Sequence, residues 1–180
     1  MTNEILILTK TDIILSYLAG FFDGEGSVGI YSSGNTYRNC CLRVQLKQNQ
    51  NPHTIIIFDF LYSNYGGFTS KVETGKGKIC LTWAASGDKA VNFLKDILQF
   101  SIIKNEQIKL CIEWQIGRKN TPRDLNGRLL KKEEEEIKRD IYFSNKVRLL
   151  KDTPLGKPYK TLKGKTSEKG CKKWTKKENK

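Results

Sequence analysis

The feature that most constrains the fold of this chain is a switch from helical to alternating apolar spacing that occurs twice in the first 100 residues. The predicted helices cover 12–23, 52–64, 86–98 and 104–116. The predicted strands cover 27–32, 37–48, 68–73 and 78–85. The resulting order, αββαββα followed by another helix, predicts an α+β fold built on an antiparallel sheet.

The first predicted helix, capped by Thr11 or Asp12, ends in a segment that combines small residues with a carboxylate. Small residues recur on one side of this helix at Ser16, Ala19, Gly20 and Gly24. That spacing allows a second helix backbone to approach closely. Glu25 is expected just past the helix tip. The segment occurs once in 180 residues, so a site that needs two such acids would need two chains.

The charge balance indicates a polyanionic partner, meaning nucleic acid or an anionic membrane surface. The formal net charge is +13, with 32 Lys and Arg against 19 Asp and Glu. No apolar run is long enough for a membrane helix, and the first residues resemble neither a signal peptide nor a transit peptide. The five cysteines form no C-x-x-C pair, and His53 is the single histidine. These counts favour a reducing compartment and exclude a zinc site or a histidine cluster.

One predicted strand has a basic, amide-rich face. Arg43, Gln45 and Lys47 alternate with apolar residues over 42–47, so they share the face away from the core. Such side chains suit phosphates and base edges, although an ordinary solvated face remains an alternative. The chain divides into a core over 1–118, a helical extension over 119–150 and a tail over 151–180 that holds eleven lysines against three carboxylates.

The segment around Glu25 also matches the G-x-G-x-x-G pattern, over 24–29. A dinucleotide site would need a strand before this pattern and a helix after it, and the order here is reversed. Taken with the αββαββα order, Leu18–Gly26 instead closely resembles the signature of the LAGLIDADG homing endonucleases. The matching residues are Leu18, Ala19, Gly20, Asp23 and Gly26, and Glu25 stands where the family has Asp or Glu. The resemblance covers roughly residues 12–117.

The resemblance implies an αββαββα core with an antiparallel DNA-binding sheet, plus C-terminal helices and a basic tail. A single motif implies a homodimer that contacts itself through Ser16, Ala19 and Gly20. Glu25 and the Gly24 carbonyl would hold Mg²⁺ as cofactor. Among the other catalytic residues, Gln50, with Gln48 as the alternative, would position the attacking water, and Lys104 would stabilise developing negative charge.

The family also implies double-stranded DNA as partner, read by two hairpins per chain over a near-palindromic site of about 20 base pairs. The implied DNA contacts are Tyr31, Ser33, Asn35, Arg38, Arg43, Gln45, Lys47, Lys71, Lys76 and Lys78. Which face of the second hairpin meets DNA is left open, because Leu81 and Trp83 share one face and Cys80 and Thr82 the other.

The resulting hypothesis is an intron-encoded, site-specific endonuclease that makes a Mg²⁺-dependent double-strand break. Two alternatives on the same fold are a maturase that binds its host intron RNA and a catalytically silent DNA-binding protein. The presence of Glu25, Lys104 and a candidate glutamine together favours the nuclease. The composition, rich in Lys, Ile and Asn, suits an AT-rich genome. It favours an organelle-encoded protein of a chloroplast or mitochondrion, or a bacterial cytoplasmic protein, that is not secreted.

Overall fold

The order of elements predicted from the sequence is confirmed. The computed structural model describes residues 9–32, 40–74, 77–118, 125 and 133–152. The helices are α1 (Lys10–Glu25), α2 (Pro52–Tyr65), α3 (Asp88–Leu98), α4 (Asn105–Arg118) and α5 (Glu134–Asp152). The strands are β1 (Gly26–Ser32), β2 (Cys40–Asn49), β3 (Phe68–Glu73) and β4 (Ile79–Ser86). Of the expected basic tail, only its first two residues are described, and they belong to α5.

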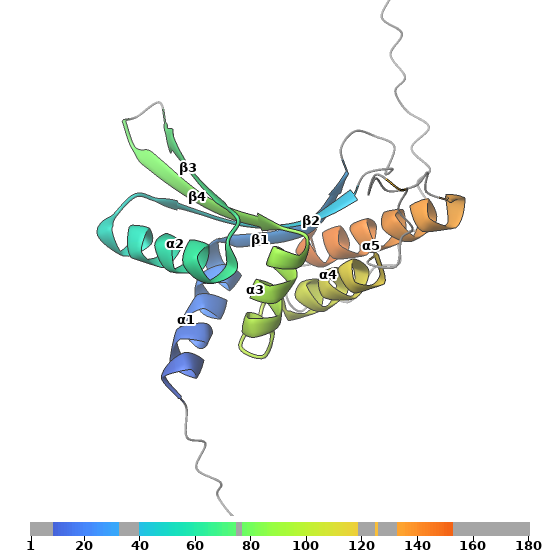
Figure 1. Cartoon of the computed structure of the whole chain (residues 1–180), viewed down its shortest axis with the longest axis horizontal. Coiled ribbons are helices and arrows are strands. Elements are labelled where there is room, and N and C mark those ends of the chain that lie inside the picture. The colour runs from blue at the N-terminus through green and yellow to red at the C-terminus, as the bar shows by residue number, and fades with distance from the viewer. Residues whose placement is uncertain (1–8, 33–39, 75–76, 119–124, 126–132, 153–180) are drawn as a thin grey trace, which may run out of the picture.

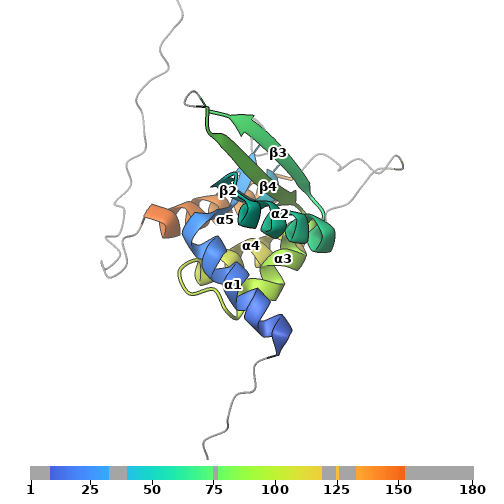
Figure 2. The same ribbon diagram turned by 90° about the vertical axis from the view of Figure 1, so that its left-hand side faces the viewer.

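The four strands form one antiparallel sheet in the order β1-β2-β4-β3. The helices lie on one face of this sheet and leave the other face open (Figure 1). Helix α1 projects away from the sheet, so the half of it that precedes the motif extends beyond the body of the domain (Figure 2). The fold therefore presents two separate surfaces, an open sheet face and the exposed side of α1.

The core fills the space between the sheet and the helices. Phe93 of α3 lies at its centre, and its ring packs edge-on against Trp83, Tyr65 and Phe22, with ring centroids 5.1 to 5.3 Å apart. The apolar residues of β2 at 42, 44 and 46 are fully buried on the same side. The alternation read from the sequence is therefore confirmed, and the intervening polar residues of β2 lie on the open face.

Helix α1 begins earlier and ends later than predicted. Thr9, rather than Thr11 or Asp12, is the N-cap, and Asp12 completes a capping box with it. At the other end, the Gly26 N–H bonds to the Phe22 carbonyl and closes the last turn. A Cβ at position 26 would overlap the Phe22 ring, so only glycine fits there. Glu25 is consequently the last helical residue and does not lie beyond the tip.

Helix α5 is part of the core and not only a surface extension. Phe143 and Val147 belong to the same buried cluster as the strands. Hydrogen bonds join α5 to α4 and to β1. The Trp114 indole donates to Asp140 at 2.7 Å, and Ser144 donates to the Ile30 carbonyl at 3.1 Å. This packing brings the end of α5 close to β1. In the described part of the chain, no helix has the length and hydropathy of a membrane span.

Candidate active site

The tip of α1 is fastened to the start of α4 by one carboxylate. Asp23 is 8% exposed, and its two oxygens accept four hydrogen bonds. The donors are Ser101 Oγ at 2.7 Å and the backbone N–H groups of Ile102, Ile103 and Lys104 at 2.7, 2.9 and 3.1 Å. These amides precede α4 and would otherwise lack partners. The motif's first acid is therefore structural, because its oxygens are occupied by donors from a segment about 80 residues away.

Burial by itself would raise the pKa of Asp23. The hydrogen bonds from Ser101 and from the three backbone amides favour the ionised form, and on balance they hold the pKa of this carboxyl below its ordinary value of 3.8. Asp23 is thus a buried carboxylate whose charge is stabilised by hydrogen-bond donors, with the Lys104 ammonium nearby.

Lys104 is brought to the same tip. Its ammonium donates to the backbone carbonyl of Asp23 and lies 5.8 Å from the centre of the Phe22 ring. Burial lowers the pKa of Lys104, as does the nearby charge of Lys151, although the carboxylates of Asp23 and Glu25 oppose this shift. The sequence interpretation placed Lys104 near Glu25, and the structure puts the two residues within electrostatic reach of each other.

Glu25 and Gly24 differ from Asp23 in being exposed. A Cβ placed on Gly24 would meet no atom within 4 Å, so the tip is open to a ligand. Carboxylate and carbonyl oxygens are the hard donors that Mg²⁺ prefers, and water and phosphate oxygens would complete its shell. The donor set at the tip therefore fits Mg²⁺. Within the described ranges, no group of three His, Cys, Asp or Glu side chains lies close enough to hold a metal.

The register of β1 and β2 distinguishes the two glutamine candidates. Gly26 pairs with Leu46, and β2 then runs past the tip of α1. Gln48 lies about 7 Å and Gln50 about 13 Å further along the strand direction. Gln48 shares the helix-side face with Leu46, and its Oε1 accepts from the Asn49 N–H at 2.8 Å. Gln50 is exposed beyond the end of β2. The register therefore places Gln48, the alternative named from the sequence, nearer than Gln50 to the strand position that pairs with Gly26.

The exposed side of α1 carries two of the three residues predicted for self-association. Ser16 and Gly20 are exposed, and a Cβ on Gly20 would meet nothing within 4 Å. Ile13 and Tyr17, 56% and 58% exposed, flank them. Ala19 differs from the prediction, because it is completely buried within this chain's own core. It lies about 100° around the helix from Gly20 and so faces the sheet and α3.

The open sheet face, which we call the outer face, carries Arg43, Gln45 and Lys47, which the sequence alternation placed together, and also Tyr31. The pairing also settles the orientation of the second hairpin. Lys47 pairs with Thr82, and Thr82 pairs with Ser70. Directly paired residues project to the same side of a sheet. The outer face therefore continues through Cys80, Thr82 and Ala84 on β4 and Phe68, Ser70 and Val72 on β3.

The same register shows on which face Lys71, one of the predicted DNA contacts, lies. Lys71 pairs with Leu81, which pairs with Gln48, so Lys71 lies on the helix-side face and not on the outer face. A shift of one residue reverses the side to which every side chain points. Lys78 is exposed just before β4. Ser33, Asn35, Arg38 and Lys76 lie outside the described residues.

The structure adds a basic residue that the sequence reasoning missed. Arg118, at the end of α4, donates to the Cys40 carbonyl and lines a cavity of about 530 Å³ with Arg43 and Tyr31. The Arg43 guanidinium lies 5.7 Å from the centre of the Phe68 ring, and its buried Nε has no partner in the described region. Arg118 gives no signal in the sequence because it is the last residue of an otherwise ordinary helix.

The same arrangement of strands and helices occurs in solved homing endonucleases. A structure of I-CvuI in complex with the I-CreI target and Mg has a TM-score of 0.58 at 19% identity and covers 81% of this chain and 86% of that one. The archaeal intron-encoded I-Vdi141I, complexed with DNA, gives 0.55 at 17% identity over 82% and 89%. A double mutant of I-SmaMI gives 0.52 at 17% identity over 85% of this chain and 48% of that one. TM-scores of 0.52 to 0.58 at such low identity show a shared fold and no more.

No protein-family model matches the sequence, and no curated protein matches it. The structural likeness and the residues at the tip of α1 therefore carry the functional argument together.

Proposed function

We propose that this chain, which has the LAGLIDADG homing endonuclease fold, is an intron-encoded, site-specific DNA endonuclease that acts as a Mg²⁺-dependent homodimer. One observation carries the proposal. An exposed carboxylate, Glu25, stands at the tip of a helix that Asp23 fastens in place, beside Lys104 and next to an open basic sheet face. A DNA strand lying on that face would pass within reach of the acid.

The chemistry follows from the residues at the tip. Glu25 and the Gly24 carbonyl would hold Mg²⁺, which supplies Lewis-acid polarisation of the phosphate and lowers the pKa of a bound water. Lys104 provides a fixed positive charge for the negative charge that develops on the phosphate oxygens. Gln48 offers an amide that can orient a water near the tip. Asp23 keeps Glu25 and Lys104 in register by joining their two elements.

A double-strand break needs one such site for each strand. In the proposed homodimer, the exposed side of α1 packs against its counterpart, so both copies of Glu25 come to the centre. The open environment of Gly20 and the exposed Ile13 and Tyr17 support this arrangement. Apolar side chains on a projecting helix favour burial against a partner.

Replacing Gly20 by glutamate is expected to convert the dimer into a monomer. The side chain would put a charge between the two helices, while the isolated chain has room for it. The matched control is Thr11→Glu, which adds the same charge to the opposite side of α1. Sedimentation equilibrium measures the outcome. A Gly20→Glu variant that remains as dimeric as Thr11→Glu would contradict the proposed interface.

Replacing Lys47 by methionine is expected to weaken DNA binding by about threefold to tenfold, for all sequences alike. The slope of log affinity against log salt should fall by about 0.9 for each phosphate that the protein no longer neutralises. Lys95→Met, on α3 away from the outer face, removes the same charge and serves as control. Fluorescence anisotropy at several salt concentrations gives both values. Equal slopes for the two variants would show that Lys47 does not bind a phosphate.

The activity itself is tested on a plasmid that joins the sequences flanking the intron carrying this reading frame. Purified protein with Mg²⁺ is expected to make one double-strand cut near that junction, and EDTA is expected to prevent it. Tight binding without a cut would contradict the endonuclease and point to a DNA-binding protein. Binding to the intron RNA alone would point to a maturase.

A further inference from the structure

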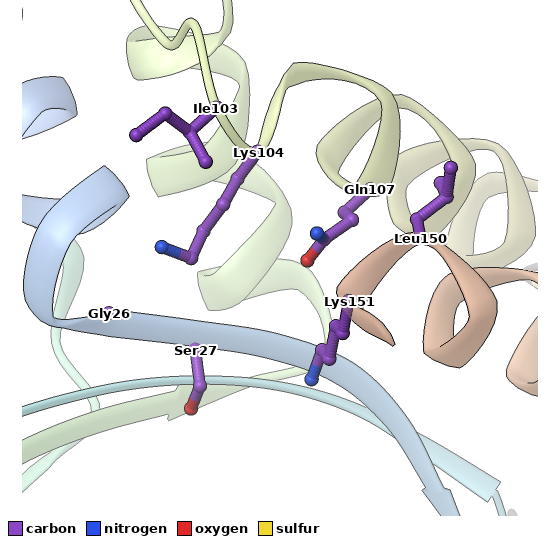
Figure 3. Close-up of a pocket in the computed structure, with 7 residues that line it drawn as sticks. All are labelled: Gly26, Ser27, Ile103, Lys104, Gln107, Leu150 and Lys151. Carbon is purple, nitrogen blue, oxygen red and sulfur yellow. The ribbon is translucent and has the colours of Figure 1, made fainter. Parts of the chain in front are cut away.

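A cavity of about 350 Å³ lies beside the tip of α1, between β1 and the two helices α4 and α5. It is lined by Gly26, Ser27, Ile103, Lys104, Gln107, Leu150 and Lys151. Figure 3 shows Gln107 and Lys151 projecting from α4 and α5 toward β1, while Lys104 reaches toward the end of α1. Lys151, from the last turn of the final described helix, thus shares a cavity with Lys104.

The cavity is cationic. Its lining holds two lysines and no carboxylate. The Lys104 ammonium bonds to a backbone carbonyl, and the nearby Asp23 oxygens already accept four hydrogen bonds. No ion pair of Lys151 occurs within the described residues, and its nearest described aromatic contact is Tyr31, with the ammonium 5.9 Å from the ring centre. Two ammonium groups in one half-enclosed space repel each other unless an anion lies between them.

A second observation also points to a ligand. Gln107 is 6% exposed, and its Oε1 is buried without a hydrogen-bond partner among the described residues. A buried amide oxygen without a partner costs about 1–3 kcal/mol, so such a group normally meets a donor from a bound molecule or an ordered water. A hydrated anion would supply a donor for Gln107 and a negative charge between the lysines. Its water can donate to the Gln107 oxygen while its own oxygens accept from the lysines.

We propose that this cavity binds a phosphate group, held by Lys104 and Lys151, and that the group is a backbone phosphate of bound DNA adjacent to the one that is cut. The inference rests on the proposed function for its choice of DNA as the source. The cavity begins at Gly26, the residue after Glu25. It includes Ser27, which pairs with Gln45 and so belongs to the outer face. A DNA backbone that reaches Glu25 from that face passes the mouth of the cavity.

Lys151 is thereby a positioning residue supplied by α5, and its role is to fix the neighbouring phosphate so that the reacting one lies at Glu25. Free inorganic phosphate offers the same chemistry, so the experiment uses both sources. The test variant is Lys151→Met, an exposed position whose replacement keeps the aliphatic stem. The control is Lys138→Met on the same helix, where the side chain is 59% exposed and pairs with Glu134 and Glu135.

In the first arm, inorganic phosphate is titrated into the full-length ¹⁵N-labelled protein at constant ionic strength, and the side-chain amide signals of Gln107 are followed. We expect saturable shifts in the wild type and in Lys138→Met, and binding about tenfold weaker in Lys151→Met. Shifts of equal midpoint in all three proteins would overturn the assignment of the cavity.

In the second arm, affinity for duplex DNA is measured in EDTA at several salt concentrations, so no cleavage is needed. Lys151→Met should lower the salt slope by about 0.9 per chain relative to Lys138→Met. If the cavity binds inorganic phosphate but Lys151→Met leaves the salt slope of DNA binding unchanged, the phosphate in the cavity does not come from DNA. Since neither arm depends on cutting, a protein that never cleaves DNA would refute the proposed function without altering these readouts, and an active nuclease with unaltered slopes would refute this inference alone.

Discussion

Glu25→Gln is expected to reduce Mg²⁺-dependent cleavage by at least about a hundredfold while changing DNA affinity by less than about threefold. Glutamine keeps the size and shape of the side chain but removes the negative charge that would hold the cation. Glu25 is exposed at the end of α1 and its side chain makes no hydrogen bond within the described structure, so the variant should fold normally. The effect is therefore expected in catalysis and not in stability or binding.

The matched control for this experiment is Glu113→Gln, an exposed carboxylate on α4 on the side away from the buried core. Single-turnover cleavage of the plasmid that joins the intron's flanking sequences measures the cleavage rate. Fluorescence anisotropy in Ca²⁺ measures the affinity for DNA. Cleavage by Glu25→Gln at the rate of the Glu113→Gln control would remove Glu25 from the mechanism. A rate that falls together with binding would mean that Glu25 contributes to the interface.

Asp23→Asn is expected to destabilise the protein by about 3 kcal/mol, the second large effect. The amide NH₂ would face donors that now bond to a carboxylate oxygen, and the remaining bonds would lose their charge assistance. Asp59→Asn, at an exposed position of α2, removes the same charge and is expected to change stability by less than about 0.5 kcal/mol. Urea unfolding followed by circular dichroism measures both values. Equal urea midpoints for Asp23→Asn and Asp59→Asn would contradict the role of Asp23 in joining α1 to α4.

The same carboxylate predicts a pH dependence. Its pKa is lowered in the folded state from the ordinary value of 3.8. The ionised form therefore stabilises the fold above pH 3.8, and this contribution is lost as the pH falls through the lower, folded-state pKa. The difference in unfolding free energy between wild type and Asp23→Asn should thus be constant near neutrality and shrink in acid. A difference that grew as the pH fell would contradict the assignment.

The sequence located the parts of the candidate site that depend on local patterns. Alternation along β2 placed Arg43, Gln45 and Lys47 on one face, because side chains of a strand project to opposite sides in turn. The helical spacing before Gly26, together with the signature letters, placed Glu25 at the end of a helix and Lys104 at the start of another. In each case neighbouring residues contained the information.

The remaining features depend on pairings between distant segments. The orientation of the second hairpin follows from Thr82 pairing with both Lys47 and Ser70, which no local pattern specifies, so the sequence left open the face on which Lys71 lies. Ala19 was assigned to an exposed stripe because the sequence does not give the rotation of α1 against the sheet. Packing between distant segments sets both features: the pairing partner fixes which side a strand residue faces, and the packing of α1 fixes which of its residues are buried.

The sequence by itself determined the order of helices and strands, which side chains of β2 face the core, and the presence of an acid at the tip of α1. Those features rest on backbone geometry that repeats every two or 3.6 residues. The tertiary structure alone decided that Asp23 fastens α1 to α4, that Gly26 pairs with Leu46, two residues before Gln48, and that Lys151 shares a cavity with Lys104. These contacts join segments far apart in the chain, and their positions are set by how the buried faces pack together.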